Sequence, residues 1–317
     1  MTLASEKPGT PDLASRPSVK VVIPHLNGHD ALDRCLASLE ADSRRSGVPI
    51  SVIVVDNGST HLPSETCAPY PFVRLVEERE PGPGPARSHG ARLADTPLLA
   101  FIDADCTAQP GWLAAILAHF ESHPDTAVIG GDVRIARADP ARPTAIEAYE
   151  SVYGYRMKLY VERDHYTATC NMAVRREVFL RVGDFAGIQL AEDVDWGRRA
   201  TAMGYRIDYV PEMRIETPAR ESFAELARKW DRHIGHDFSE VRSGKDRLKW
   251  VARAVALAAS PLAETGRIMR SDRLNGLNER WLGLTCLTRI RLYRCRKMLG
   301  LLAGFGRSSA SAWRNEG

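Results

Sequence analysis

The feature that most constrains the fold is a series of short apolar runs that alternate with segments of helical periodicity. Runs at 19–24, 50–55, 72–76 and 98–102 consist largely of apolar residues, and segment 31–40 carries its apolar residues at helical spacing. Strands that are apolar throughout are buried on both faces, and strands separated by helices pair in parallel. The sequence therefore predicts an α/β fold with a mainly parallel sheet and helices on both faces.

The order of these segments also predicts the domain boundaries. Residues 1–18 are rich in Pro, Ser and Thr and contain no apolar stretch, so we expect a disordered leader without an export signal. We expect residues 19–240 to form the α/β domain, in two halves that meet near 135–136. Residues 241–317 are basic and rich in Leu and Ala, which predicts a helical C-terminal region.

The formal net charge of +3 conceals an uneven distribution of charge. Residues 241–317 carry 16 basic and 5 acidic side chains, whereas the rest of the chain carries 27 and 35. An acidic N-terminal part suits carboxylates grouped around a cation. A basic C-terminal region suits a phosphate-bearing surface such as a membrane leaflet or a nucleic acid, although a plain solvated helical face explains it equally well.

Two further patterns bear on the compartment. The six cysteines form no CxxC or CxxH pair, so neither a zinc site nor a disulfide framework is expected, and a reducing compartment is indicated. The longest apolar stretch, 250–262, is interrupted by Arg253 and Pro261 and is shorter than the ~20 residues of a bilayer span. We expect a cytoplasmic protein without a transmembrane helix, and peripheral contact with the inner face of the membrane stays open.

Carboxylates follow two of the predicted strands at the point where each strand ends. Asp56 comes directly after 50–55, and Asp103 and Asp105 follow 98–102. The carboxyl ends of parallel strands meet at one edge of a sheet, which is where such folds bind ligands. Hard cations such as Mg²⁺ and Mn²⁺ prefer oxygen ligands and accept the phosphates of a substrate as well. Each Asp by itself is also a common turn former.

Two later segments add candidate chemistry. Arg87 follows the Pro- and Gly-rich loop 81–85 near the start of a predicted helix, where a phosphate would also meet the helix dipole. Glu192 and Asp193 stand at the start of another predicted helix, where the dipole alone favours acidic residues. A partly buried Asp at the edge of a pocket can also take the proton of an attacking hydroxyl.

Six segments, in this order along the chain, resemble the motifs of the family 2 glycosyltransferases. Segment 21–27 is similar to the first strand and loop of that family, 54–60 to its nucleotide-contacting Asp segment, and 101–105 to its DxD motif. Segments 171–176 and 182–185 match two further family patterns, and 192–196 resembles its Glu-Asp pair. The resemblance implies a GT-A fold, a nucleotide-diphosphate sugar donor with a UDP-sugar first, a divalent cation (Mn²⁺ or Mg²⁺), and inversion by a single displacement. It makes 19–135 the nucleotide-sugar half and 136–240 the acceptor half.

The resemblance also implies roles for single residues. Asp193, paired with Glu192, would be the general base; Asp103 would contact the ribose or the sugar, and Asp105 would bind the metal. Donor contacts would also come from Pro24, Asn27, Asp56 and Arg87, with Asp56 at the base of the nucleotide.

Contacts to the acceptor, which would be a glycan, a lipid-linked sugar or a small molecule, would come from Trp196 and Asn171. Two positions depart from the family pattern. Ser88 replaces the usual Asn after Arg87, and Glu216 stands where many relatives have a metal-binding His, so Glu216 is the candidate second ligand.

Other functions were weighed against sugar transfer. A nucleotidyltransferase would need a Gly-rich, basic phosphate loop after the first strand, and a dehydrogenase would need GxGxxG there; 24–29 supplies neither. An inactive nucleotide-sugar-binding protein of the same fold stays open. His233 and His236, three residues apart on a predicted helix, are either ligands or part of a polar face. No nucleic-acid partner is expected, and polysaccharide biosynthesis is the expected process.

Overall fold

The computed structural model describes residues 18–188 and 190–304, so the expected leader lies, except for its last residue, outside the described residues. The chain divides into two compact units. The sheet unit contains the described residues up to Val133 together with Met157–Thr217. The helical unit contains Arg134–Arg156 and the described residues from Pro218 onward.

The sheet unit is built on eight strands in the order β3-β2-β1-β4-β7-β6-β8-β5. The strands are β1 (Val19–His25), β2 (Ser51–Asp56), β3 (Val73–Glu77), β4 (Leu98–Ile102), β5 (Thr107–Ala108), β6 (Val128–Ala136), β7 (Asn171–Arg175) and β8 (Ile207–Pro218). Strands β3, β2, β1 and β4 pair in parallel, as predicted. Strand β7 joins β4 and β6 antiparallel, and β5 joins β8 antiparallel. A buried strand has the same apolar pattern in either direction, so only the structure reveals this antiparallel part.

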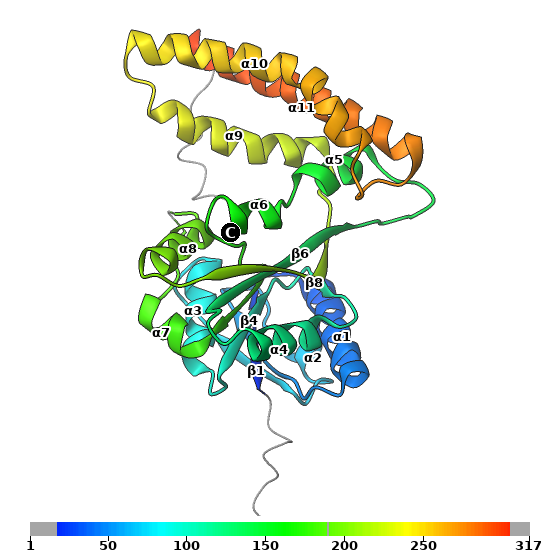
Figure 1. The fold of residues 1–317 in the computed structure, drawn as a ribbon, viewed down its shortest axis with the longest axis vertical. Helices are drawn as coiled ribbons and strands as arrows, with labels where there is room; N and C mark the ends of the chain where they lie inside the picture. Colours follow the sequence, from blue (N-terminus) through cyan, green and yellow to red (C-terminus); the bar gives the residue numbers. More distant parts are fainter. Residues whose placement is uncertain (1–17, 189, 305–317) are drawn as a thin grey trace, which may run out of the picture. The chain divides into compact units, whose positions relative to one another are not determined.

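Within the described residues the sheet unit has seven helices, and six of them form two groups of contacts: α1 with α2 and α4, and α3 with α7, which also contacts α8 (Figure 1). Their bounds are α1 (His29–Ser46), α2 (Ser64–Cys67), α3 (Pro83–Leu93), α4 (Trp112–Ser122), α6 (Met157–Glu162), α7 (Arg176–Val182) and α8 (Glu192–Ala202). Helix α3 packs tightly on β1, because a Cβ at Gly90 would lie 2.4 Å from a methyl carbon of Val22. Only glycine permits this approach, which brings the first turns of α3 close to the strand ends.

The helical unit contains α5 (Ala145–Tyr153), α9 (Phe223–Ser239), α10 (Gly244–Met269) and α11 (Gly276–Leu302). Helices α10 and α11 run side by side, and α11 also contacts α5 and α9 (Figure 1). Capping boxes at Thr144 and Ser243 begin α5 and α10. Among the helices of residues 18–188 and 190–304, none is long and apolar enough to cross a bilayer.

The compact units divide the chain at a different place from the predicted boundary at 240. Helix α9 belongs to the helical unit, because its buried Leu226 packs with Leu287 and Ile290 of α11. Segment Arg134–Arg156, which from residue 136 onward falls in the predicted acceptor half, is also part of the helical unit. All six cysteines are free, and in α9 the ring of His233 lies 5.5 Å from the ring of Trp230.

Candidate active site

The carboxyl ends of β2, β1 and β4 lie next to one another, as the parallel order requires. Asp56 is the last residue of β2, and it stands opposite His25, the last residue of β1. Asp103 directly follows β4. The folded sheet therefore places these three polar side chains along one edge, at the strand ends where α/β sheets bind ligands.

Asp56 is buried, with 2% of its surface exposed, and its carboxylate accepts four hydrogen bonds. The donors are the hydroxyl of Ser59 (2.5 Å), the backbone amides of Ser59 (3.0 Å) and Gly58 (3.3 Å), and Nδ1 of His25 (2.9 Å). The backbone amide of Gly28 donates to Nε2 of His25 at 3.2 Å. Nε2 is therefore the unprotonated nitrogen, and Nδ1 carries the hydrogen that is donated to Asp56.

These hydrogen bonds decide the charge state of Asp56. Burial alone would raise the pKa of the carboxyl, but the hydrogen bonds from Ser59 and His25 outweigh it and hold the pKa below its usual value. Asp56 is thus a charged acceptor whose oxygens are already used within the protein. Its expected contact with a nucleotide base stays a prediction, and it requires one of these hydrogen bonds to be exchanged.

Replacing Asp56 by Asn is expected to lower the free energy of unfolding by about 1–3 kcal/mol at neutral pH, because an amide NH₂ would face hydrogen-bond donors. The gain of the wild type in the free energy of unfolding is fully present at pH values above the unfolded-state pKa of about 3.9. It is lost as the pH falls through the lower folded-state pKa. Urea unfolding of both proteins across this range measures the difference, with the exposed Asp125→Asn as control. A difference that stays constant into acid would contradict the role of the charge.

The loops after β1 and β2 hold each other in place. The side-chain oxygen of Asn27 accepts from the amide of Thr60 at 2.8 Å, and the amide of Asn27 donates to the hydroxyl of Ser59 at 2.8 Å. Asn27 has a left-handed φ of 55°, which Asn tolerates better than most residues. Asn27 is exposed and Pro24 is half-buried, so both remain candidates for donor contact.

Arg87 joins two of the predicted motifs. From the second turn of α3, its buried guanidinium donates to Oδ1 of Asp103 at 2.5 Å and to Oε1 of Glu192 at 3.0 Å. The two carboxylates hold the pKa of Arg87 above its usual value against the effect of burial. Nε of Arg87 is buried and has no hydrogen-bond partner within the described residues. The DxD segment and the start of α8, far apart in the sequence, therefore meet at this one side chain.

The electrostatics around Cys170 show the same convergence. Burial raises the pKa of this thiol well above its ordinary value, and three carboxylates add to the effect, those of Asp103, Asp105 and Asp193. Charges interact more strongly inside a protein than in water. The DxD carboxylates and the candidate base thus all act on the same buried thiol.

Asp105 and Asp193 are both held toward their neutral forms. Asp105 is an exposed residue, but partial desolvation of its carboxyl raises its pKa, and the charge of Asp103 raises it further. Burial and the charge of Glu192 raise the pKa of Asp193. A raised carboxyl pKa in a cleft is typical of a group that exchanges a proton.

The residues present offer few protein ligands for a metal ion. Asp103 is engaged by Arg87, which leaves Asp105 as the carboxylate available at this edge. Glu216 of β8 pairs with Thr107, two residues beyond Asp105. Within 18–188 and 190–304, no three His, Cys, Asp or Glu side chains are grouped to hold an ion. This donor set fits a Mg²⁺ or Mn²⁺ ion that takes most of its oxygen ligands from substrate phosphates and water, and Glu216 as second ligand stays a prediction.

The two acceptor contacts predicted from the sequence, Trp196 and Asn171, are buried side chains in the structure. Trp196 is 1% exposed, its Nε1 donates to the carbonyl of Gly183 at 2.8 Å, and its ring packs in the core. Asn171 is fully buried, and its amide bonds to backbone carbonyls and to the ring nitrogen of Trp112. Side chains without exposed surface cannot contact an acceptor in this structure. Both side chains instead pack inside the sheet unit.

Sequence reasoning missed three residues that the structure places near the site. His25 was part of a recognised motif, but only its register with Asp56 reveals the hydrogen bond. Tyr160 and Tyr166 stack with ring centroids 5.0 Å apart. The pKa of Tyr166 is raised first by burial and then by Tyr160 and Asp193, so this half-buried pair lies close to the candidate base. Tyr149, Tyr153 and Tyr160 form an aromatic series in the sequence, and this series is the signal that points to Tyr160.

Comparison with known proteins finds similar sequences over much of the chain. The profile described as glycosyl transferase family 2 matches residues 20–183, half of the chain. Glycosyltransferase AglE of Haloferax volcanii is 28% identical over 248 residues, which are 76% of this chain and 77% of that protein. A pre-mycofactocin glycosyltransferase of Mycobacterium tuberculosis is 30% identical over 220 residues, 66% of this chain and 44% of that longer protein.

Two solved structures are similar over most of the chain. One is the mannosyltransferase PcManGT from Pyrobaculum calidifontis in complex with GDP-Man and Mn²⁺, at 19% identity and a TM-score of 0.49, covering 97% of this chain and 81% of that one. The other is S. aureus TarS in complex with UDP-GlcNAc, at 14% identity and a TM-score of 0.49, covering 94% and 76%.

Proposed function

The chain belongs to glycosyl transferase family 2 and is a glycosyltransferase, and we propose that it transfers a sugar from a nucleotide-diphosphate donor to a hydroxyl acceptor with inversion at the anomeric carbon. The observation that carries this proposal is the pair of hydrogen bonds by which Arg87 joins Asp103 and Glu192. It brings the donor side of the site next to the candidate base. Family membership removes the nucleotidyltransferase alternative and leaves the inactive binding protein to be tested.

The donor would lie along the ends of β2, β1 and β4. Asp56 and Asn27 order the loops at the nucleotide end, and Asp105 holds the divalent cation at the diphosphate end, with Glu216 as its proposed second ligand. When bound, Mn²⁺ or Mg²⁺ neutralises the charge that develops on the diphosphate leaving group. Arg87 acts through Asp103, which it orients toward the sugar. It stays bound to Asp103 and Glu192, because moving away would leave two carboxylates unpaired at a high cost in free energy.

Asp193 would take the proton of the acceptor. In a single displacement the acceptor oxygen forms a bond to the anomeric carbon while the bond to the diphosphate oxygen breaks. The nucleoside diphosphate leaves with the electron pair, and the hydroxyl proton passes to the Asp193 carboxylate. Glu192 is bound to Arg87 and orients the start of α8. Among the described hydrogen bonds, the Asp193 carboxylate accepts only one, from the backbone amide of Val194. Its remaining lone pairs can therefore take this proton.

The stacked rings of Tyr160 and Tyr166 are the proposed acceptor platform in place of Trp196. Aromatic faces bind the apolar faces of sugars, and the Tyr hydroxyls add polar contacts. Relatives are named for different acceptors, among them pre-mycofactocin and validoxylamine A. The acceptor is therefore sought among glycans, lipid-linked sugars and small alcohols. Polysaccharide biosynthesis remains the predicted process, and a cytoplasmic location at the inner face of the membrane remains the predicted location.

A nucleotide-release screen tests the proposal. UDP-, GDP- and dTDP-sugars are incubated with acceptor mixtures, with and without Mn²⁺, and the released nucleoside diphosphate is measured. We expect release that depends on both the cation and an acceptor. No release with any combination would favour the inactive binding protein.

Replacing Asp105 by Asn in this screen is expected to raise the Mn²⁺ concentration needed for half-maximal activity by about tenfold or more, because the site loses the first of its two proposed carboxylate ligands. Asp95→Asn is the matched control. Asp95 stands before β4, at the opposite end of the strand, and its side chain, 82% exposed, forms an ion pair with Lys20. Loss of an ion pair with such an exposed partner costs little. An unchanged Mn²⁺ requirement in Asp105→Asn would remove this residue from the cation site.

A further inference from the structure

One face of helix α10 is apolar and exposed along most of its length. Leu248, Val255 and Leu262 lie seven residues apart and expose 72%, 57% and 84% of their surface. The exposed positions between and after them on the same face are small, namely Ala252, Ala259 and Gly266. The steps between neighbours alternate between four and three residues, so the six form one stripe of about 27 Å at helical rise. We call it the α10 stripe.

The fold of the helical unit does not use the α10 stripe. The opposite face of α10 supplies its packing through Trp250, Ala254 and Ile268, all buried. Nε1 of Trp250 also donates to the carbonyl of Met298 in α11 at 2.9 Å. Helix α10 is therefore anchored by one side and presents the other to its surroundings. Contiguous apolar surface of this kind marks a place of interaction.

The exposed charges of α10 beside the stripe are positive. The exposed charged residues of α10 are all basic: Lys245, Arg247, Lys249, Arg253 and Arg267. Arg253 is paired with Asp237 of α9 at 2.8 Å, whereas no ion pair within the described residues involves Lys245, Arg247 or Lys249. The two acidic residues of the helix are less exposed and are already engaged. Asp246 caps the helix through Ser243, and Glu264 pairs with Arg267 and accepts from the hydroxyl of Tyr153. The apolar stripe is thus flanked by positive charge.

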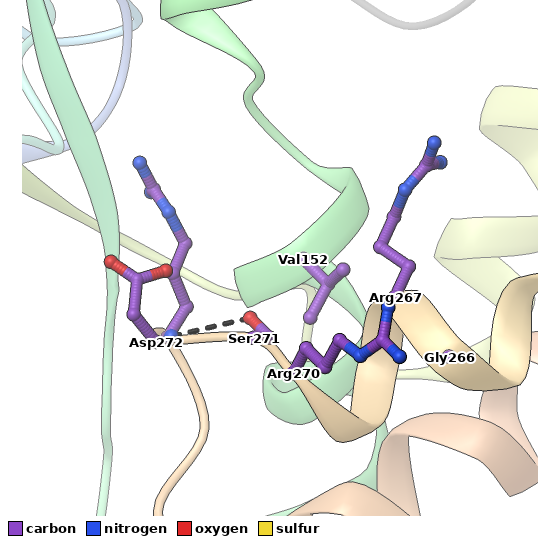
Figure 2. Close-up of a pocket in the computed structure, with 7 residues that line it drawn as sticks. Val152, Gly266, Arg267, Arg270, Ser271 and Asp272 are labelled. Atoms are coloured by element: carbon purple, nitrogen blue, oxygen red, sulfur yellow. Dashed lines mark hydrogen bonds between the residues drawn. The ribbon is translucent and has the colours of Figure 1, made fainter.

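An open hollow of about 490 Å³ adjoins the C-terminal end of the stripe (Figure 2). It is lined by Val152, Gly266, Arg267, Arg270, Ser271, Asp272 and Arg273, so Gly266 belongs to both the stripe and the hollow. Figure 2 shows the side chains of Arg267 and Arg270 leaving the last turns of α10. Asp272, the acidic member, lies 3.8 Å from Arg134. Guanidinium groups of this kind suit phosphate oxygens.

Three occupants can be compared on these observations. A second copy of the chain would bury the stripe but would bring like charges together without an acidic partner. A nucleic acid would match the charge but would leave the apolar stripe unused. The surface of an anionic bilayer satisfies both, because acyl chains take up the apolar residues while lipid phosphates meet the flanking cations.

We propose that helix α10 docks the protein on an anionic lipid surface, with the α10 stripe in the acyl boundary and lipid phosphates at the arginine-lined hollow. The helix lies in the plane of the surface, since it is not apolar enough to cross it. This binding requires no sugar transfer, so it stands or fails separately from the proposed activity.

Vesicle co-sedimentation of the full chain tests the proposal. The vesicles are phosphatidylcholine alone, or the same lipid with a third replaced by phosphatidylglycerol. We expect pelleting only with the anionic vesicles. Leu248→Gln combined with Leu262→Gln should weaken the binding by about tenfold or more, because two exposed apolar anchors are lost. The matched control combines Leu180→Gln with Met203→Gln, exposed residues of the sheet unit, and should bind as the wild type does.

A second variant tests the hollow. Arg267→Gln with Arg270→Gln should shift binding toward higher phosphatidylglycerol content while the melting temperature stays unchanged. Equal pelleting of the wild type and the Leu variant, or none with either vesicle, overturns the proposal. So does a dimer in sedimentation equilibrium that the Leu variant converts to monomer without any vesicle binding. Binding of inorganic phosphate without binding of vesicles overturns it as well.

Discussion

Replacing Asp193 by Asn is expected to reduce sugar transfer by about 10²–10⁴-fold, the usual contribution of a positioned general base. The amide has the shape of the carboxylate but cannot take up the proton of the acceptor hydroxyl. Donor binding should persist, because Asp103 and Asp105 are unchanged. Single-turnover transfer and calorimetric binding of the donor separate the two effects. Full turnover by the variant would remove Asp193 from the mechanism.

Asp195→Asn provides the matched control for this substitution. Asp195 lies two residues further along α8 and pairs with Arg199 at 2.9 Å in a partly exposed i,i+4 contact. Losing such a contact costs only a few tenths of a kcal/mol, so activity should stay within a few-fold of the wild type. A loss as large as that of Asp193→Asn would point to disturbance of α8 instead of loss of a base.

The raised pKa of Asp193 gives the same prediction a pH signature. A base acts when deprotonated, so activity falls as the pH drops through its pKa. Because burial and Glu192 raise that pKa, the acid limb of kcat/KM should lie above the usual range of an Asp side chain. The residual activity of Asp193→Asn should lack this limb. An acid limb at the same pH in both proteins would assign it to another group.

Replacing Arg87 by Met is expected to lower the free energy of unfolding by about 3 kcal/mol, the lower end of the range for breaking a buried ion pair. The side chain of Arg87 is 4% exposed, whereas Asp103 and Glu192 keep 32% and 23% exposure. Their remaining solvent contact moderates the loss. Activity should also fall where the variant is folded, because the ion pairs of Arg87 join the DxD segment to the start of α8. Urea unfolding and single-turnover transfer measure the two effects.

Arg92→Met on the same helix is the control for Arg87→Met. Arg92 pairs with Asp184, and both side chains are about half exposed. Exposed ion pairs contribute about 0–1 kcal/mol. The control should therefore unfold close to the wild type and keep its activity. Equal destabilisation by the two substitutions would show that Arg87 contributes no more than a surface residue.

Much of the sheet could be predicted from the sequence alone. The apolar runs that become β1, β2, β3 and β4 are local patterns, and a parallel order follows from the helices between them. The position of Asp56 and Asp103 at strand ends is equally local. Once the strands are parallel, these ends must share one edge, so the grouping of these carboxylates followed from the order of the residues. The family motifs were visible for the same reason.

Other features depend on which surfaces the chain buries, and that is decided by contacts between distant segments. The sequence motif around Trp196 looks the same whether the ring faces solvent or the core, and only packing against Phe179 and Phe185 decided it. Arg87 was visible as a phosphate candidate, but its two carboxylate partners lie 16 and 105 residues away. The α10 stripe likewise became a free surface only when α11 covered the other side. Periodicity shows which residues share a face, whereas the tertiary structure determines whether anything covers that face.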